Sequence, residues 1–259
     1  MLSHLKRLIS RRIKRGTSPR DDRPELPEMI CAIREAAHQG HVAAQVQWGD
    51  ILLESIYLPS DPVRARQWYG IAASSGYGPA HNMLGRCHHF GWGGPVDLPA
   101  AATHYGIAAA KGDLWGNYNL AIMTMRGIGM TADLPRALAL FRTGAEAGHP
   151  KSMNLLARFI EEGWHTPRDP ATALVWYRRA AEAGDYRGQH NYATALLALG
   201  KQMEALDWWE KALADATTDV LLAMQKRLRA LDDPRARDLL PRVHTRLALL
   251  GVTTSPGGG

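Results

Sequence analysis

A glycine occurs at a fixed interval through most of this chain of 259 residues. It closes five similar segments, from "REAAHQG" to "RRAAEAG", and successive copies lie 36 residues apart. The five positions are Gly40, Gly76, Gly112, Gly148 and Gly184. An interval of this length is typical of helical repeat proteins, in which each unit buries its apolar face only by stacking on its neighbours. The chain is therefore expected to fold as a stack of units rather than around one globular core.

Other residue columns recur in phase with the glycine and predict two helices in each unit. An aspartate lies fifteen residues before four of the glycines, and a proline follows one or two residues later. These pairs are Asp61 and Pro62, Asp97 and Pro99, Asp133 and Pro135, and Asp169 and Pro170. Such an aspartate caps the start of a helix, and a proline in the first turn lacks only an N–H that would stay unpaired. The glycine then ends this second helix in the left-handed conformation.

The first helix of each unit is predicted from small residues placed four and nine residues after the glycine, where they let neighbouring helices approach closely. Together the columns read small-x3-L-G … G-x-G-x3-D-x3-A-x2-W/F-Y/F-x2-A-A-x2-G, most fully over 80–112 and 116–148. This pattern resembles the Sel-one-like repeat of bacterial proteins, a relative of the tetratricopeptide repeat. The resemblance implies an all-α protein, a right-handed α/α superhelix of about five helical hairpins with capping helices.

Two units depart from the pattern, and the ends of the chain lie outside it. The first unit has "SIYLPSD" in place of the glycine-containing turn, and the fifth is four residues shorter than the others. We expect a basic amphipathic arm and linker at 1–24, the repeat solenoid at 25–216, C-terminal capping helices at 217–250 and a flexible tail at 251–259.

The net charge of +6 belongs to the arm and not to the repeats. Residues 1–20 carry seven basic side chains and no acidic one, which leaves 24 basic and 25 acidic residues in the remainder. Two cysteines are too few for a disulfide framework, and no apolar run reaches the roughly 18–20 residues that cross a bilayer. With no secretory signal at the N-terminus, we expect a cytoplasmic protein.

The arm, "MLSHLKRLISRRIKRG", places four apolar residues close to one helical face and basic residues elsewhere. The apolar residues are Leu2, Leu5, Ile9 and Ile13. Three roles stay open for residues 1–20: docking on an anionic membrane surface or on a partner, contact with nucleic acid, and a solvated tail. Nucleic acid is the least favoured partner, and a location at the membrane would be peripheral.

No motif predicts catalysis, a metal or a cofactor. Cys87, His88 and His89 are contiguous, so on a helix they point in different directions and do not match the ligand spacing of zinc sites. No nucleophile elbow, phosphate-binding loop or H-E-x-x-H motif is present in the sequence. We therefore expect a protein that is not an enzyme and that has no bound cofactor.

A solenoid offers a concave groove lined by its first helices. By similarity to tetratricopeptide packing, the groove-facing positions lie three, six, ten and thirteen residues after each glycine. The predicted partner-binding residues are Asn82, Arg86, His89, Trp115, Tyr118, Ile122, Met125, Lys151, Asn154, Arg158, Glu161, Arg187 and His190. Exposed aromatic residues beside arginine are typical of binding hot spots. The alternative is that Trp115 and Met125 pack between units and that the charges form a solvated face.

The resemblance implies a non-enzymatic scaffold or adaptor that binds a protein or peptide in the groove. Two alternatives stay open. One is a dedicated inhibitor, or immunity protein, that neutralises a toxic effector. The other, which we favour less, is an enzyme of cell-wall or β-lactam chemistry, because some relatives have been linked to it. The sequence leaves the oligomeric state undetermined.

Overall fold

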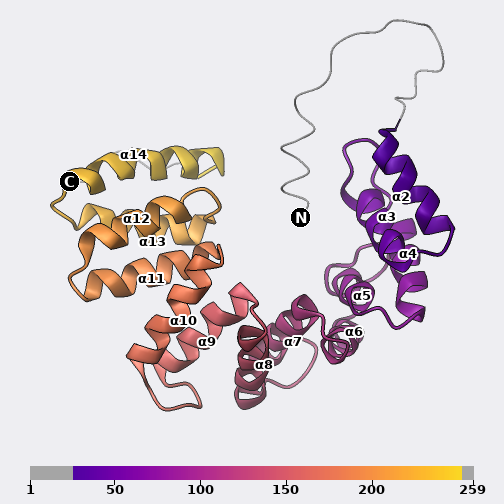
Figure 1. The fold of residues 1–259 in the computed structure, drawn as a ribbon, viewed down its shortest axis with the longest axis horizontal. Helices are drawn as coiled ribbons and strands as arrows, with labels where there is room; N and C mark the ends of the chain where they lie inside the picture. Colours follow the sequence, from indigo (N-terminus) through magenta and orange to yellow (C-terminus); the bar gives the residue numbers. More distant parts are fainter. Residues whose placement is uncertain (1–25, 253–259) are drawn as a thin grey trace, which may run out of the picture.

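The computed structural model describes residues 26–252, so the predicted arm at 1–20 and most of the predicted tail lie outside the described residues. Within 26–252 the chain forms thirteen α-helices and no strand. They follow one another as a curved stack of helical hairpins (Figure 1). The prediction of an all-α solenoid is confirmed.

Five hairpins have a first and a second helix at nearly constant spacing. The first helices are α3 (Val42–Glu54), α5 (Gly78–Phe90), α7 (Leu114–Arg126), α9 (Pro150–Glu162) and α11 (Tyr186–Ala198). The second helices are α4 (Pro62–Ser74), α6 (Leu98–Ala110), α8 (Leu134–Glu146), α10 (Pro170–Glu182) and α12 (Gln202–Ala212). One helix precedes the hairpins and two follow them: α2 (Glu28–His38), α13 (Thr218–Arg229) and α14 (Pro234–Leu249).

The helix ends lie where the repeated residues predict them. The side chain of each predicted aspartate caps its second helix, as in α6, where Asp97 accepts a hydrogen bond from the backbone N–H of Ala100 at 3.0 Å. The repeated glycine follows each second helix with φ between +73° and +93°, a region that an L side chain rarely adopts. Local backbone chemistry therefore sets both ends of the second helices α4, α6, α8 and α10.

The first unit reaches the same turn without glycine. Its turn, residues 55–61, has the same length as residues 91–97 of the next unit. The backbone N–H of Asp61 donates to the carbonyl of Leu52 at 2.7 Å, as that of Asp97 donates to His88 at 2.9 Å. The C-terminal residue of the first helix is followed by extended Ser55 where the next unit has left-handed Gly91. One backbone hydrogen bond thus preserves the turn although the residues differ.

Small residues bring the two helices of a hairpin into close contact. Gly49 faces the ring of Tyr69, and a Cβ placed on this glycine would lie 2.5 Å from the nearest ring carbon. Gly85 and Tyr105 repeat the arrangement in the next unit, again with 2.5 Å. Both tyrosine side chains are buried. The hairpins of α3 with α4 and of α5 with α6 therefore depend on a glycine that leaves room for a fixed aromatic ring.

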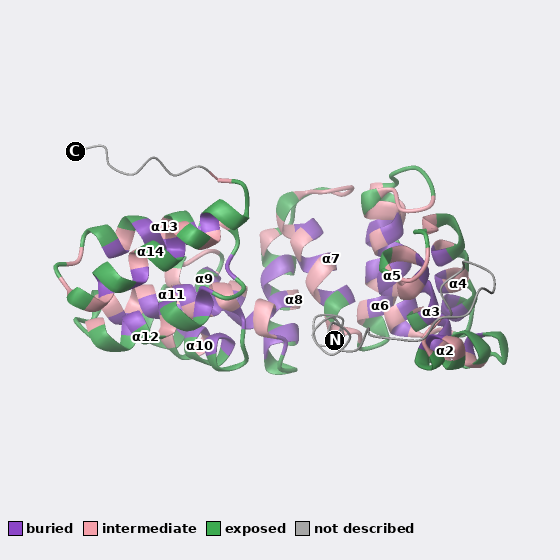
Figure 2. Cartoon of the chain, turned by 90° about the horizontal axis from the view of Figure 1, so that it is seen from above, coloured by how far each residue is buried: buried purple, intermediate pink, exposed green. Residues whose placement is uncertain are grey.

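Contacts between units join a second helix to the first helix of the next unit, such as α6 with α7 and α10 with α11, and also join successive first helices, such as α5 with α7 and α9 with α11. In Figure 1 α5 and α7 lie on the inner side of the arc, and α6 and α8 lie on its outer side. Buried residues follow the sides on which neighbouring helices meet, and exposed residues surround them (Figure 2). α13 packs on α11 and α14 on α12, so the last two helices continue the stack as one more hairpin.

Candidate functional site

We call the solvent-accessible side chains of α3, α5, α7, α9 and α11 the inner face. Its most exposed tryptophan is Trp115, at the start of α7, which is 50% exposed. The indole meets the ring of His149 edge-on at 4.9 Å, and the ring of Tyr118 lies 5.2 Å from the same histidine. The structure therefore brings together Trp115 and Tyr118, two of the predicted residues, around a histidine that the prediction did not include.

His149 is buried and holds this aromatic cluster in place. Its Nδ1 accepts the backbone N–H of Ser152 at 3.3 Å and so caps α9. Burial and, to a smaller extent, nearby Lys151 together lower the pKa of the imidazole to about 4. The ring is therefore neutral at physiological pH, and it supports Trp115 without adding charge. A fixed and exposed indole is a suitable anchor for a protein partner.

Two of the predicted residues, Lys151 and Arg187, pair with carboxylates of the chain itself. Lys151 Nζ lies 3.6 Å from the buried carboxylate of Asp185, and Arg187 donates to Asp219 at 2.7 Å. Both cations also lie 5.3 Å from the ring centre of Tyr186. The hydrogen bond from Arg187 lowers the pKa of Asp219 to about 2, so this pair stays ionised. These two cations are thus already neutralised by the protein itself.

Two other predicted arginines keep their charge available. The guanidinium carbon of Arg86 lies 4.7 Å from the ring centre of Trp92, and that of Arg158 lies 5.2 Å from Trp164. Within residues 26–252 neither guanidinium forms an ion pair. The two pairs occupy equivalent places two units apart. Stacking on an indole orients a guanidinium and leaves its N–H groups free to bind an acceptor.

Three predicted residues lie inside the protein. Asn82, Asn154 and His190 are 8%, 4% and 7% exposed, because the position six residues after the glycine turns toward the neighbouring helix. Asn82 accepts a hydrogen bond from Asn119 at 2.9 Å, and Asn154 accepts one from Asn191 at 2.8 Å. These three side chains were predicted to face a partner, but their burial leaves them almost no surface for one.

The four remaining predicted residues are half-buried. Ile122 and Met125 pack against the core, and His89 stacks on Phe90 with 4.5 Å between ring centres. Glu161 accepts a hydrogen bond from the hydroxyl of Tyr177 at 2.7 Å.

The prediction missed three accessible residues on α7 and α11, each one position after a predicted column. Asn119 and Asn191 are partly exposed, and Arg126 is exposed at the end of α7. Asn119 and Asn191 lie seven residues after the glycine and Arg126 fourteen, directly after two of the predicted columns. A shift of the predicted phase by one residue could have found all three.

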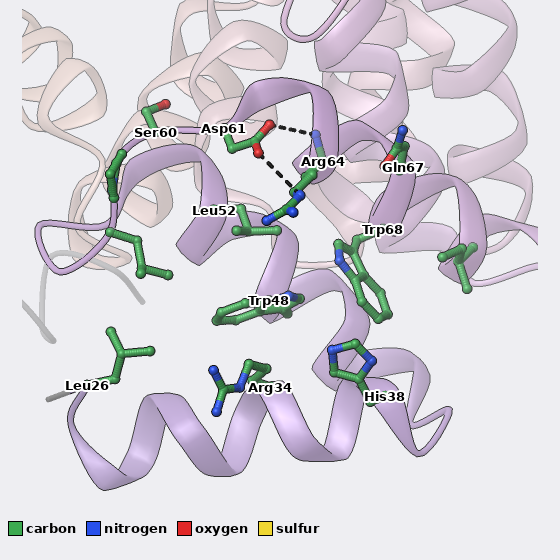
Figure 3. A pocket seen from close by; sticks show the side chains of 13 residues that line it. Leu26, Arg34, His38, Trp48, Leu52, Ser60, Asp61, Arg64, Gln67 and Trp68 are labelled. Atoms are coloured by element: carbon green, nitrogen blue, oxygen red, sulfur yellow. Dashed lines mark hydrogen bonds and ion pairs between the residues drawn. The ribbon is translucent and has the colours of Figure 1, made fainter. Parts of the chain in front are cut away.

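A hollow lies at the N-terminal end of the stack, between α2, α3, α4 and the turn that joins α3 to α4. It measures about 780 Å³, and Trp48 and Trp68 line it with other apolar residues. Figure 3 shows these indoles with Arg34 and His38 projecting into the space. Arg64 is paired with Asp61 at 3.5 Å across its upper edge. The hollow combines aromatic surface with cationic groups, but it opens widely to solvent.

Three histidines cluster between α5 and α6. His104 stacks on His81 and on His88, with 5.4 Å and 5.3 Å between ring centres. Arg66 lies 3.1 Å from His88, and the pKa values of all three imidazoles are lowered, chiefly by burial. No group of three ligating side chains in residues 26–252 is arranged to hold a metal ion.

The repeats can now be compared with known families. The Sel1 repeat matches residues 42–77, 78–113, 116–149, 150–185 and 190–215, which together are more than half of the chain. The chain belongs to the Sel1 repeat family. Its repeats form a fold that proteins typically use for interaction with other proteins. Among residues 26–252, no helix combines the length and apolar character that crossing a bilayer requires.

Two solved structures are similar to this chain in sequence as well as in fold. A protective antigen of uropathogenic Escherichia coli is 29% identical over 86% of this chain, with a TM-score of 0.67. A Sel1 repeat protein from Oxalobacter formigenes is 25% identical over 76% of it, with a TM-score of 0.66. The chain spans 49% and 58% of the length of these two proteins.

An immunity protein from Pseudomonas aeruginosa shows the same fold, at 14% identity over 89% of this chain and 85% of its own, with a TM-score of 0.54. A search of curated proteins found no match.

Proposed function

We propose that the protein is a non-enzymatic scaffold that binds a protein or peptide partner on its inner face, with Trp115 as the anchor. The observation that carries the proposal is the exposure of this indole, 50%, while His149 and Tyr118 hold it in place. Exposed tryptophans on rigid supports are enriched among the residues that dominate binding energy. Membership of a repeat family typical of protein interaction supports the same reading.

The arginines on either side give the partner a second requirement. Arg86 and Arg158 lie on the units that flank α7, and each is oriented by an indole. We infer that they bind acceptor groups of the partner, while Lys151 and Arg187 mainly shape the surface because carboxylates already neutralise them. Residues 25–216 are the interaction unit in this proposal, and residues 217–250 close its C-terminal end.

Capture of partners from cell extract tests the proposal when each variant has a matched control. Trp115→Ala removes the anchor, and Val175→Ala removes an apolar side chain on α10 that is 56% exposed. Arg158→Glu reverses an inner-face charge, and Arg142→Glu reverses an exposed charge on α8. We expect Trp115→Ala and Arg158→Glu to lose the same partner while both controls retain it. Equal capture by all four variants would refute the proposal.

The second candidate function is neutralisation of a toxic protein by the same face. It is supported by the immunity proteins that share the fold. The two functions differ in what the captured partner does. If the partner is an enzyme whose activity the wild-type protein abolishes and Trp115→Ala does not, the chain is an inhibitor. If the partner keeps its activity in the complex, the chain is a scaffold.

We also propose that the protein acts in the cytoplasm. Its two cysteines, Cys31 and Cys87, are free in the structure and fit a reducing compartment. Fractionation of cells with a compartment marker tests this part independently of partner binding.

A further inference from the structure

α2 has the sequence of a second helix, but it has no first helix of its own among residues 26–252. Counted back from the repeated glycine, Met29 corresponds to buried alanines of four second helices. Ile33 corresponds to their buried aromatic residues. The alanines are Ala65, Ala101, Ala137 and Ala173, and the aromatic residues are Tyr69, Tyr105, Phe141 and Tyr177. All eight are at most 2% exposed, whereas Met29 is 48% exposed.

The difference arises because α2 has no first helix of its own unit to pack on among residues 26–252. In a complete unit the aromatic residue packs on a small residue of its own first helix, as Tyr69 packs on Gly49. α2 instead packs on α3, which is the first helix of the following unit. Met29, Ala32, Ile33 and Ala36 follow the spacing of one helical face and remain wholly or partly accessible. We call these four residues the α2 strip.

The strip is distinct from the hollow of Figure 3. Arg34 and His38 point into that hollow from one side of α2, whereas Ile30 and Ala37 are buried against the core. The strip lies on the opposite side of these buried residues, at the helical positions that a first helix covers in other units.

The chain itself carries a segment that fits this surface. Twenty-seven residues precede α2, and a complete unit uses a helix of thirteen residues and a turn of seven before its second helix. Residues 2–13 place Leu2, Leu5, Ile9 and Ile13 close to one helical face and basic residues elsewhere. Glu28 and Glu35 are exposed on α2 beside the strip and complement this positive charge.

We propose that residues 2–13 pack as an amphipathic helix on the α2 strip and complete the first hairpin. The segment is part of the same chain as α2, so its effective concentration at the strip is higher than that of a separate partner. Its apolar face covers Met29 and Ile33, and its basic face remains in solvent. A membrane surface and a second copy of the chain are the competing occupants. The proposal does not depend on partner binding at the inner face.

Hydrogen exchange of the full-length chain tests this docking. In the wild type we expect the amides of residues 2–13 to exchange at least about tenfold more slowly than in a free peptide of the same sequence. Met29→Asp should abolish this protection, while the control Val175→Asp, on the distant α10, should retain it. Unchanged protection of residues 42–54 in both variants shows that α3 is still folded. Free-peptide exchange in the wild type, or unaltered protection in Met29→Asp, overturns the proposal.

Crosslinking identifies the occupant. In a Cys31→Ser background, the pair Ile9→Cys and Met29→Cys should form a disulfide within one chain, whereas the control pair Arg11→Cys and Met29→Cys should not. Cys87 is buried and can remain. A disulfide only between two chains assigns the strip to a second copy and overturns the proposal. Protection of residues 2–13 that arises only after addition of phosphatidylserine-containing vesicles assigns the segment to a membrane and overturns it as well.

Discussion

Replacement of Gly85 by alanine tests how closely the two helices of a hairpin must approach. The Cβ of Gly85→Ala would lie 2.5, 2.6 and 3.1 Å from three atoms of the Tyr105 ring, and that ring is 1% exposed. Ordinary carbon contacts need about 3.5–4 Å, so the ring or the helix must move by about 1 Å. Such overpacking of a rigid core costs about 1–3 kcal/mol.

Gly106 of the same hairpin provides the control. It lies in the middle of α6, as Gly85 lies in the middle of α5, but a Cβ placed on it has no neighbour within 4 Å. Both substitutions gain up to about 1 kcal/mol of helix propensity, which cancels when the variants are compared. Gly106→Ala should therefore be more stable than Gly85→Ala by about 1–3 kcal/mol.

Thermal and urea unfolding of the two variants, followed by circular dichroism at 222 nm, measures this difference. At this chain length the expected gap between their Tm values is roughly 2–10 °C. Equal stability, or greater stability of Gly85→Ala, would refute the close packing described for the hairpin of α5 and α6.

Two further predictions concern helix ends and pH. Asp97→Ala should lower the free energy of unfolding in urea by about 1 kcal/mol, because the N–H of Ala100 loses its acceptor. Asp97→Asn should keep most of this stability, because asparagine also caps helices. Equal losses in the two variants would contradict the cap. The folded protein holds His149 neutral with a pKa of about 4, while the unfolded chain takes up a proton below about pH 6.5. This contribution to stability is complete above pH 6.5 and declines toward pH 4, by at most about 3 kcal/mol. His149→Asn, which keeps a capping side chain, should flatten the decline measured by unfolding at pH 7 and pH 4.5, and an unchanged decline would exclude His149 as its source.

The repeated residues allowed the helix ends to be predicted, because capping and the left-handed glycine act within a few residues of the backbone. Asp97 and Gly112 thus lie where the sequence places them. The rotation of the first helices was harder to predict. Asn82 and His190 were expected to be accessible, yet packing between units turns them inward. Helical periodicity shows which residues share a face, but it does not show how far that face is rotated toward the neighbouring units.

The side-chain contacts between helices were the other feature that the sequence did not predict. His104 was not connected with His81 or His88, because the stack forms only when α5 and α6 pack together. The same applies to His149, whose role under Trp115 depends on the meeting of α7 and α9. The aromatic anchor itself was predicted, but the buried histidine that supports it was not.

The affinity of a purified partner for the wild type, Trp115→Ala and Val175→Ala tests the central claim most directly. Truncation of a tryptophan anchor that a partner covers costs at least about 2 kcal/mol, which corresponds to a rise in Kd of about 30-fold. Titration calorimetry should show that rise for Trp115→Ala alone, with the Kd of Val175→Ala equal to that of the wild type and the circular dichroism of all three proteins the same. Equal Kd values for Trp115→Ala and the wild type would contradict the assignment of the inner face as the binding surface.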